Sequence, residues 1–298
     1  MDLIVPPPSS PSEPVNSVQM PLWDERNRGL PVTFAKSALF SVGGKRERRR
    51  LDKLPIASEG ETAMVYTGEE LRTDDEDVLI QLFHLARGSS VDRNEGISVR
   101  FSGHQMLREL DWKVSKEGYE RLKACLTRMQ NGSLHQTWKV KNRKMVYAAN
   151  IIRKWVLAEG GPKQQQWCVW LEPEIRHLFD PNYALLDWNE RMSVSKPIAR
   201  WLHAFMAPVA KSEVFVAPEE VIRKLSGSTA STMPKFRQSL KEALKEMEHA
   251  RLIFSWKLWD GYLYVAREPD QDINRATQAA ALEYAKQQRA EASNEVTS

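Results

Sequence analysis

The sequence is poor in cysteine and contains no long hydrophobic run. Its 298 residues include only two cysteines, Cys125 and Cys168, which excludes a disulfide framework and favours a reducing compartment. The apolar stretches are only a few residues long, too short to span a bilayer. No charged and apolar leader precedes a small-residue cleavage site. We therefore expect a cytoplasmic protein with no membrane partner.

Recognisable catalytic motifs are missing as well. The six histidines are scattered, without a His-Glu-x-x-His pair or an accompanying cysteine pair, so no metal site is expected. Gly43-Gly44-Lys45 lacks the spacing of a phosphate-binding loop, and no Gly-x-Ser-x-Gly elbow occurs. Cys125 lies on an apolar helical stripe, which favours packing over nucleophilic chemistry. We expect no enzymatic activity and no cofactor.

Charge is distributed unevenly, although the net charge is only +4. Residues 69–95 carry eight acidic side chains against three basic ones, whereas residues 115–155 carry ten Lys or Arg against two Glu. A surface for a polyanion explains this basic bias better than an ordinary solvated helix face does. Two interpretations of the acidic residues 69–77 stay open, a site for a partner and the cap of a helix, and helix capping is the default. Nucleic acid is the predicted partner.

The first sixty residues contrast with the rest of the chain. Six prolines lie within the first 21 positions, which predicts a disordered tail over residues 1–60. Residues 45–50 of this tail, Lys-Arg-Glu-Arg-Arg-Arg, form a basic arm that would suit DNA or a targeting signal equally well. Residues 268–298, rich in Ala, Gln and Glu, are predicted to form a C-terminal tail or a frayed helix.

A regular pattern begins at residue 63. Thr73 and Glu76 predict a capping box that opens a helix, and Ser115 opens another whose buried stripe is Leu122, Leu126 and Met129. The expected order is strand 63–67, helix 73–88, strand 97–101, a helix from 102, helix 115–130, and strands 134–140 and 145–157, with a further strand at 167–171. Three helices followed by a hairpin with a basic tip predict a winged-helix domain over residues 61–182.

The same order recurs over residues 183–267. The expected elements are helix 195–206, strand 214–216, helices that start at Pro218 and Pro234, and strands 252–256 and 262–266 around the turn Asp260-Gly261. The fold class predicted from the sequence is α+β: tandem winged-helix domains with a disordered N-terminal tail.

Basic and polar side chains on the third helix of each unit predict the DNA-binding surface. A helix fits the major groove, where Arg, Lys and Gln can reach base edges or phosphates. On the first unit the candidates are Lys116, Arg121, Lys123 and Arg128 of the helix and Lys139, Lys141, Arg143 and Lys144 of the hairpin. On the second they are Lys235, Arg237, Gln238 and Lys241, with Ser231 and Thr232 as phosphate donors or plain helix caps.

Several motifs resemble those of plasmid replication initiators of the TrfA type. The similarity runs from Ala35 to Arg267. It is carried by residues 36–40 (Lys-Ser-Ala-Leu-Phe), 66–76 (Tyr-Thr-Gly-Glu-Glu-Leu-Arg-Thr-Asp-Asp-Glu), 125–130 (Cys-Leu-Thr-Arg-Met-Gln), 197–200 (Pro-Ile-Ala-Arg) and 235–237 (Lys-Phe-Arg). The resemblance implies two winged-helix domains that bind direct repeats, called iterons, in double-stranded origin DNA, with no enzymatic activity.

The same resemblance implies partners. Host initiator, helicase and sliding clamp would be recruited, and a homodimer would serve as the repressed form. Residues 19–23 (Gln-Met-Pro-Leu-Trp) are similar to a clamp-binding peptide, in which Gln19, Leu22 and Trp23 would be the anchors. An extended peptide with one polar and two apolar anchors suits a surface groove.

Two other functions fit the same sequence features, and a nicking enzyme ranks behind them because the clustered histidines that would hold its metal are missing. A winged-helix transcriptional regulator would share the fold, because the fold does not reveal which process DNA binding sets in motion. A protein-interaction scaffold would keep one DNA-binding domain and use the second unit for dimerisation. Tandem direct repeats beside the coding sequence would favour the initiator, whereas a ligand pocket or a palindromic site would favour the regulator.

Overall fold

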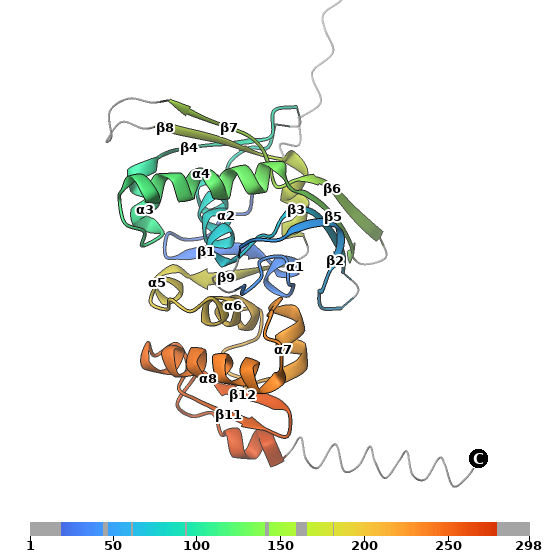
Figure 1. Cartoon of the computed structure of the whole chain (residues 1–298), viewed down its shortest axis with the longest axis vertical. Helices are drawn as coiled ribbons and strands as arrows, with labels where there is room; N and C mark the ends of the chain where they lie inside the picture. Colours follow the sequence, from blue (N-terminus) through green and yellow to red (C-terminus); the bar gives the residue numbers. More distant parts are fainter. Residues whose placement is uncertain are drawn as a thin grey trace, which may run out of the picture.

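The computed structural model describes residues 19–43, 47–60, 62–92, 94–140, 143–158, 166–180 and 182–278. Two units are stacked along the long axis of the molecule (Figure 1). The first unit extends to Met192, and the second begins at Val194. Each has its own cluster of buried apolar side chains, so each has its own core. Within the described ranges, no helix combines the length and the apolar character needed to cross a bilayer.

The first unit is built around one central helix, α2 (Thr73–Ala86), in which Val78, Leu79, Leu82 and Phe83 are fully buried. The elements around it are β1 (Asn27–Pro31), α1 (Val32–Ala35), β2 (Arg50–Ile56), β3 (Ala63–Glu69), β4 (Ile97–Ser102), α3 (Gly103–Glu109), α4 (Lys116–Asn131), β5 (Ser133–Val140), β6 (Arg143–Asn150), β7 (Ile152–Ala158), β8 (Gln166–Leu171), the 3₁₀ helix η1 (Pro173–Phe179), β9 (Tyr183–Asp187) and α5 (Trp188–Met192).

The strands of the first unit form three antiparallel sheets. Their strand orders are β2-β3-β5-β6, β4-β8-β7 and β1-β9. Helix α4 begins where predicted, because the Ser115 hydroxyl accepts a hydrogen bond from the Gly118 amide at 3.3 Å. Its stripe of Leu122, Cys125, Leu126 and Met129 is completely buried.

The second unit repeats part of this arrangement. It contains α6 (Pro197–Met206), β10 (Phe215–Pro218), α7 (Glu219–Leu225), α8 (Met233–His249), β11 (Ser255–Trp259) and β12 (Tyr262–Ala266). Its sheet has the order β10-β12-β11. In the first unit, α2, β4, α3, α4, β7 and β8 follow one another in the same way, and their sheet order, β4-β8-β7, is equivalent. The two units therefore share one topology, in which α4 corresponds to α8.

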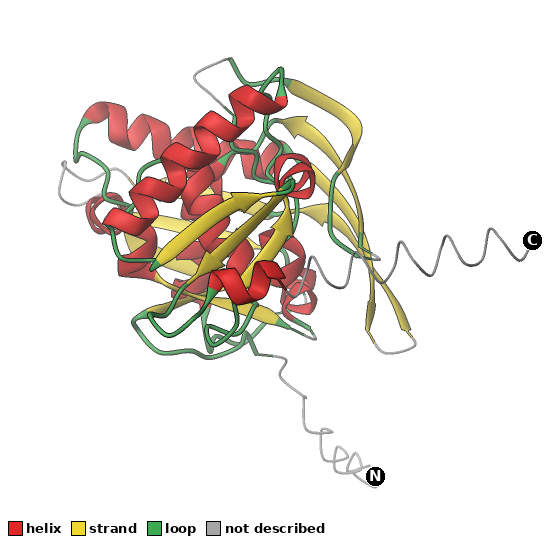
Figure 2. Ribbon diagram, turned by 90° about the horizontal axis from the view of Figure 1, so that it is seen from below, coloured by secondary structure: helices red, strands yellow, loops and turns green. Residues whose placement is uncertain are grey.

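The equivalence corrects the expected position of the first hairpin. The β5–β6 hairpin was expected to follow α4 as the counterpart of β11–β12, but it pairs with β3 and projects from the opposite side of the molecule to β7–β8 (Figure 1). Seen from below, it stands clear of the helices (Figure 2). The strand expected at 145–157 is two strands, and the second of them, β7, pairs with β8. β5–β6 is therefore an insertion between the third helix and the true counterpart of β11–β12.

The prediction of a disordered tail over residues 1–60 is wrong for the described residues 19–43 and 47–60. β1 pairs with β9 over five residues, and Leu30, Phe34 and Phe40 are buried in the core of the first unit. Proline enrichment ends at residue 21, and the apolar side chains beyond it are numerous enough to pack. Residues 1–18 lie outside the described part of the chain, as do Lys45 and Arg46 of the basic arm.

Two unit boundaries and one helix-capping residue also differ from expectation. The first core includes Ala184, Leu186 and Trp188, so the first unit extends beyond residue 182. Helix α2 uses Asp75 in place of Glu76 as its capping carboxylate, which accepts from the Arg72 amide at 2.8 Å. In the C-terminal segment, Ile273 packs on Tyr264, which extends the fold past Arg267; residues 279–298 lie outside the described ranges.

Candidate nucleic-acid interface

Helix α8 presents the most coherent basic surface among the expected elements. Thr232 precedes it and accepts a hydrogen bond from the Lys235 amide at 3.5 Å, while Pro234 occupies its first turn. Its inner face, Phe236, Leu240, Ala243, Leu244 and Met247, is fully buried. Helical periodicity places four polar side chains on the opposite face, and all of them are exposed: Lys235, Gln238, Lys241 and Lys245.

These lysines are available to an external anion. In the described part of the chain, no ion pair involves Lys235, Lys241 or Lys245, and Gln238 makes only a long contact of 3.5 Å with Glu242. Ser231 and Lys235 line a groove of about 420 Å³ that also includes Lys196 at the start of α6. Thr232 acts as the helix cap, whereas the exposed Ser231 has a hydroxyl that can donate to phosphate.

Arg237 lies on the flank of α8, toward α7. Its Nε donates to Oε2 of Glu219 at 2.5 Å. The Glu219 side chain is only 4% exposed, whereas that of Arg237 is 45% exposed. Arg237 is therefore held by a buried carboxylate at one edge of its guanidinium group and open to solvent elsewhere.

Helix α4 differs from α8 in having its cations paired. Arg121 stacks on Trp112, 3.9 Å from the ring centroid, and lies 3.5 Å from Asp74. Lys123 pairs with Glu120 at 3.2 Å. A groove of about 740 Å³ along its outer face has lining residues of both signs, among them Glu120 and Lys123. Lys116 is exposed at the first turn.

Arg128 is not part of an exposed basic face, contrary to expectation. Its side chain is 10% exposed and pairs with Asp75 at 2.9 Å, with a further bond to the Cys125 sulfur at 3.2 Å. Burial opposes its charge, but Asp75 raises the pKa of Arg128 above its usual value. Burial also raises the pKa of the Cys125 thiol, which therefore stays protonated and serves packing.

The acidic segment, residues 69–77, explains why so many arginines are paired. Arg48, from the predicted basic arm, bonds to Asp74 at 2.6 Å and Asp75 at 2.7 Å and is only 14% exposed. Arg191 of α5 is completely buried and bonds to Glu76 at 2.6 Å and Asp77 at 2.7 Å. Arg200 of α6 also pairs with Asp77. Sequence reasoning missed this network, and the only available signal was the complementary excess of acids in 69–77 and arginines elsewhere.

The sequence matches a known protein family. The family described as TrfA protein matches residues 15–267. The chain belongs to the TrfA protein family. A curated relative, "Plasmid replication initiator protein TrfA" of Escherichia coli, is 24% identical over 236 residues, which are 78% of this chain and 59% of that protein. The chain therefore spans about three-fifths of the length of that relative.

A solved structure shares the fold of this TrfA-family chain. The crystal structure of domain 2 and domain 3 of RctB matches with a TM-score of 0.52 and 12% sequence identity. The match covers 80% of this chain and 98% of that one. At this level of identity the comparison shows a common architecture of the two-unit body.

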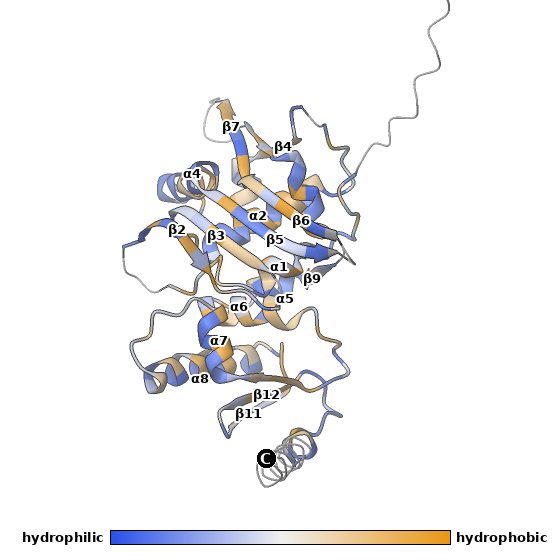
Figure 3. Ribbon diagram, turned by 90° about the vertical axis from the view of Figure 1, so that its right-hand side faces the viewer, coloured by the Kyte–Doolittle hydropathy of each residue, from blue (hydrophilic) through white to orange (hydrophobic). Residues whose placement is uncertain are grey.

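The β5–β6 hairpin of the TrfA-family chain retains an exposed basic end. Lys139 and Lys144 lie opposite each other across the two strands, and both are exposed. The free end of this hairpin is strongly hydrophilic (Figure 3). Lys141 and the side chain of Arg143 lie outside the described residues. These lysines are on the inserted hairpin, away from the strands that correspond to β11–β12.

The clamp-like peptide of the TrfA-family chain is packed against the first unit. Trp23 is 7% exposed, stacks on Phe179 and donates from Nε1 to Nδ1 of His84 at 3.2 Å. Leu22 is 75% exposed, and the exposed Gln19 forms a bridge with Ser90. Docking through Trp23 would require its release from this site, so clamp binding stays a prediction.

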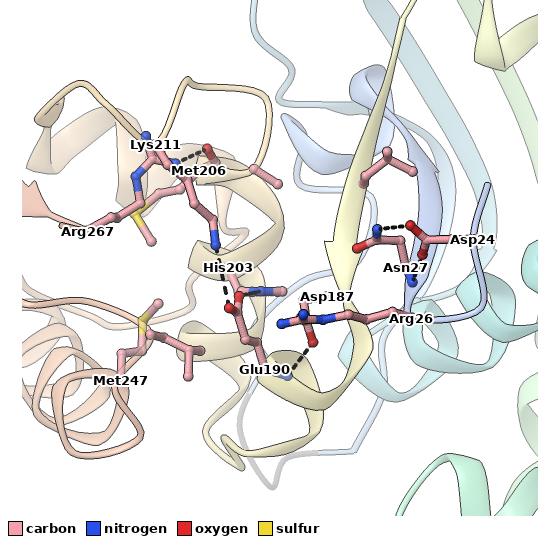
Figure 4. A pocket seen from close by; sticks show the side chains of 13 residues that line it. Asp24, Arg26, Asn27, Asp187, Glu190, His203, Met206, Lys211, Met247 and Arg267 are labelled. Atoms are coloured by element: carbon pink, nitrogen blue, oxygen red, sulfur yellow. Dashed lines mark hydrogen bonds and ion pairs between the residues drawn. The ribbon is translucent and has the colours of Figure 1, made fainter.

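A cavity of about 370 Å³ lies between the two units of the TrfA-family chain (Figure 4). Its charged groups satisfy one another: Arg26 pairs with Asp187 at 2.5 Å, and Glu190 lies 3.4 Å from His203 and 3.5 Å from Lys211. Arg267 bonds to the backbone carbonyls of Met206 and Val209. This internal pairing leaves no set of groups that selects one ligand chemistry.

Proposed function

We propose that the chain is a plasmid replication initiator that binds double-stranded origin DNA through two winged-helix units, with α8 as the principal reading helix. The shared topology of α2-β4-α3-α4-β7-β8 and α6-β10-α7-α8-β11-β12 supports the winged-helix assignment. The name of the Escherichia coli relative supports the role in plasmid replication. The observation that carries DNA binding is the row of exposed lysines on α8 that make no ion pair in the described part of the chain.

The two units contribute unequally in this proposal. On α8, Lys235, Lys241 and Lys245 are exposed together with Gln238, which suits a helix in the major groove. On α4, the acidic segment and Glu120 already neutralise most of the basic groups. The first unit would therefore add phosphate contacts through Lys116, Lys139 and Lys144 and contribute little to base reading.

The proposal extends to the finer properties implied by the family resemblance. The DNA would contain direct repeats, and the partners would be the host initiator, helicase and sliding clamp, with a homodimer as the repressed form. The chain would act by binding and would not be an enzyme. A footprint of the protein on the DNA beside its gene, over tandem direct repeats, would support this part of the proposal. A footprint on a single palindrome would contradict it and favour a regulator.

Salt dependence tests the role of α8. The triple variant Lys235→Ala, Lys241→Ala and Lys245→Ala should bind duplex DNA more weakly, and each lost phosphate contact should reduce the slope of log affinity against log salt by about 0.9. Lys211→Ala is the control for loss of a lysine outside α8 and its hairpin, because Lys211 lines the cavity between the two units and pairs with Glu190 at 3.5 Å. Fluorescence anisotropy with labelled duplex gives both slopes. An unchanged slope in the triple variant would remove α8 from the interface.

A further inference from the structure

Glu219 contacts three elements of the second unit near the start of α8: α7, α8 itself and the turn between β11 and β12. It is the first residue of α7, and its carboxylate accepts from Nε of Arg237 on α8 at 2.5 Å. Its backbone amide donates to the carbonyl of Gly261, in the turn between β11 and β12, at 2.8 Å. The residue is 3% exposed. Glu219 therefore fixes the position of Arg237 relative to both α7 and the hairpin turn.

The bond between Nε of Arg237 and Glu219 leaves the Nη1 and Nη2 groups of Arg237 free to bind another partner. A guanidinium group can present two parallel N–H donors to the O6 and N7 acceptors of guanine. With Nε bonded to Glu219, the remaining pair of donors is Nη1 and Nη2, and neither of them donates a hydrogen bond within the described part of the chain. An arginine anchored through Nε has less rotational freedom to lose when its other edge forms a fork, which favours a directed contact.

The charge of Glu219 argues against a simple phosphate contact. A buried carboxylate 2.5 Å from Arg237 offsets part of the positive charge that would attract a phosphate. The carboxylate opposes a base contact less than a phosphate contact, because guanine O6 and N7 carry partial charges whereas a phosphate carries a full negative charge, and the bidentate contact adds geometric specificity. The same Glu–Arg pair would therefore weaken general binding to DNA while sharpening base selection.

We propose that Glu219 is a positioning residue that aims the Nη1–Nη2 edge of Arg237 at a guanine in the major groove. This inference rests on the proposed function, because it assigns a specificity role within the α8 interface. Arg237 makes the base contact, and Glu219 acts through it. Gln238 and Lys241, on the outer face of α8, lie beside this contact on the helix.

The test is selection from a duplex pool with a randomised central segment, followed by affinity measurements on the selected and the random duplexes. Glu219→Met keeps the length of the side chain and removes the acceptor. It should lower the preference for guanine at one base pair by about tenfold, and Arg237→Lys should lower it by about ten- to a hundredfold. Glu219→Met should leave affinity for random duplex unchanged or raise it. The double variant should be no worse than Arg237→Lys, because both changes remove one contact.

Glu220→Met is the matched control. Glu220 is the next residue of α7, is exposed and makes no ion pair in the described part of the chain, so its replacement removes the same charge without touching Arg237. It should leave the guanine preference intact. Glu219→Gln, which keeps an acceptor oxygen and the same shape, guards against misfolding and should show an intermediate loss of preference. Circular dichroism confirms that each variant is folded.

The outcomes separate the inference from the proposed function. If wild-type protein enriches a guanine-containing motif and both Glu219 variants keep the same preference, Glu219 has only a structural role and the inference is overturned. A uniform loss of affinity for every sequence would overturn it too, since that result indicates destabilisation. If wild-type protein enriches no sequence, the proposed function itself fails, and the positioning role with it.

Discussion

Trp23, His84 and Glu25 form a hydrogen-bonded chain that holds the first described residues against α2. Trp23 donates to Nδ1 of His84, so the proton of the neutral ring sits on Nε2, which lies 3.1 Å from Glu25. A protonated ring would carry hydrogens on both nitrogens and could no longer accept from Trp23. One protonation therefore breaks the contact that fixes the indole.

The pH dependence of this contact is set by the pKa of His84. Burial lowers the pKa of His84 below its usual value of 6.5, although the bond to Glu25 opposes the shift. The folded state thus favours the neutral ring, and its stabilisation is present above the unfolded pKa and is lost as the pH falls below it. The free energy of unfolding should decrease between about pH 7 and about pH 5.

The variant His84→Gln isolates this contribution. Glutamine does not titrate and can still accept from Trp23, so the variant should lose less stability over the same pH interval than wild-type protein. Urea denaturation at each pH measures the difference, and His203, whose pKa is also lowered by burial, remains in both proteins as an internal control. Equal pH dependence in the two proteins would contradict a role for His84.

The equivalent helices α4 and α8 use their basic side chains differently. Helix α8 carries its lysines outward, whereas α4 uses Arg128 to bind Asp75 at the first turn of α2. The carboxylate of Asp75 is fully buried and also accepts from Arg48 at 2.7 Å. The basic side of α4 thus serves mainly to hold two elements of the first unit together.

Loss of Arg128 should therefore destabilise the first unit. Arg128→Ala leaves the buried Asp75 with one fewer cation, and removal of one partner of a buried ion pair typically costs about 3–5 kcal/mol. Lys123→Ala, on the same helix but in a surface pair with Glu120, should cost at most about 1 kcal/mol. Urea unfolding monitored by circular dichroism measures both. If the two variants are equally stable, the ion pair of Arg128 contributes no more than a surface contact.

Elements with strong local signals were predictable from the sequence. Both ends of helix α4 and the start of α8 were expected close to the observed positions, because capping residues and an apolar stripe of period 3.6 lie in or beside the helix itself. The turn Asp260-Gly261 also predicted the β11–β12 hairpin correctly. The secondary structure of such segments is set mainly by neighbouring residues in the sequence and depends little on distant parts of the chain.

Features that depend on distant partners were not predictable. β5–β6 was assigned to the wrong sheet because strand pairing is set by β3, some seventy residues upstream, and no local pattern records it. Arg128 was expected on the exposed face from helical periodicity, which gives no information about Asp75 on α2, and its side chain is in fact only 10% exposed. Arg237 is exposed as expected, but its bond to Glu219 of α7 could not be predicted for the same reason. The lysines of α8 are exposed as expected, and within the described ranges no carboxylate forms an ion pair with Lys235, Lys241 or Lys245.

At the scale of the whole molecule, buried charges connect the two units. Arg191, just before the second unit, bonds to Glu76 and Asp77 of α2, and its Nη1 donates to the carbonyl of Arg200 in α6. These groups are fully removed from water, so each depends on its partners to offset the cost of desolvation. The network makes the position of the second unit depend on α2.

Arg191→Met should cost about 3–5 kcal/mol, because it leaves Glu76 and Asp77 buried with too few partners. The units should also unfold less cooperatively, so that transitions followed by near- and far-ultraviolet circular dichroism no longer coincide. The triple variant Glu76→Leu, Asp77→Leu and Arg191→Met should recover most of the stability, since Arg200 retains its bond to the Val194 carbonyl. A triple variant as unstable as the single one would show that the charges themselves are required.

The pairing of β1 with β9 has a consequence for the order in which the chain can fold. Asn27 lies opposite Asp187, so the strand that closes the first unit is synthesised only after nearly all the rest of that unit. Such a contact has a high sequence separation, and its entropic cost delays it relative to local hairpins and helices. During translation, β1 must therefore wait as an unpaired edge until β9 leaves the ribosome, and a nascent chain stalled before residue 183 would expose that edge to other chains.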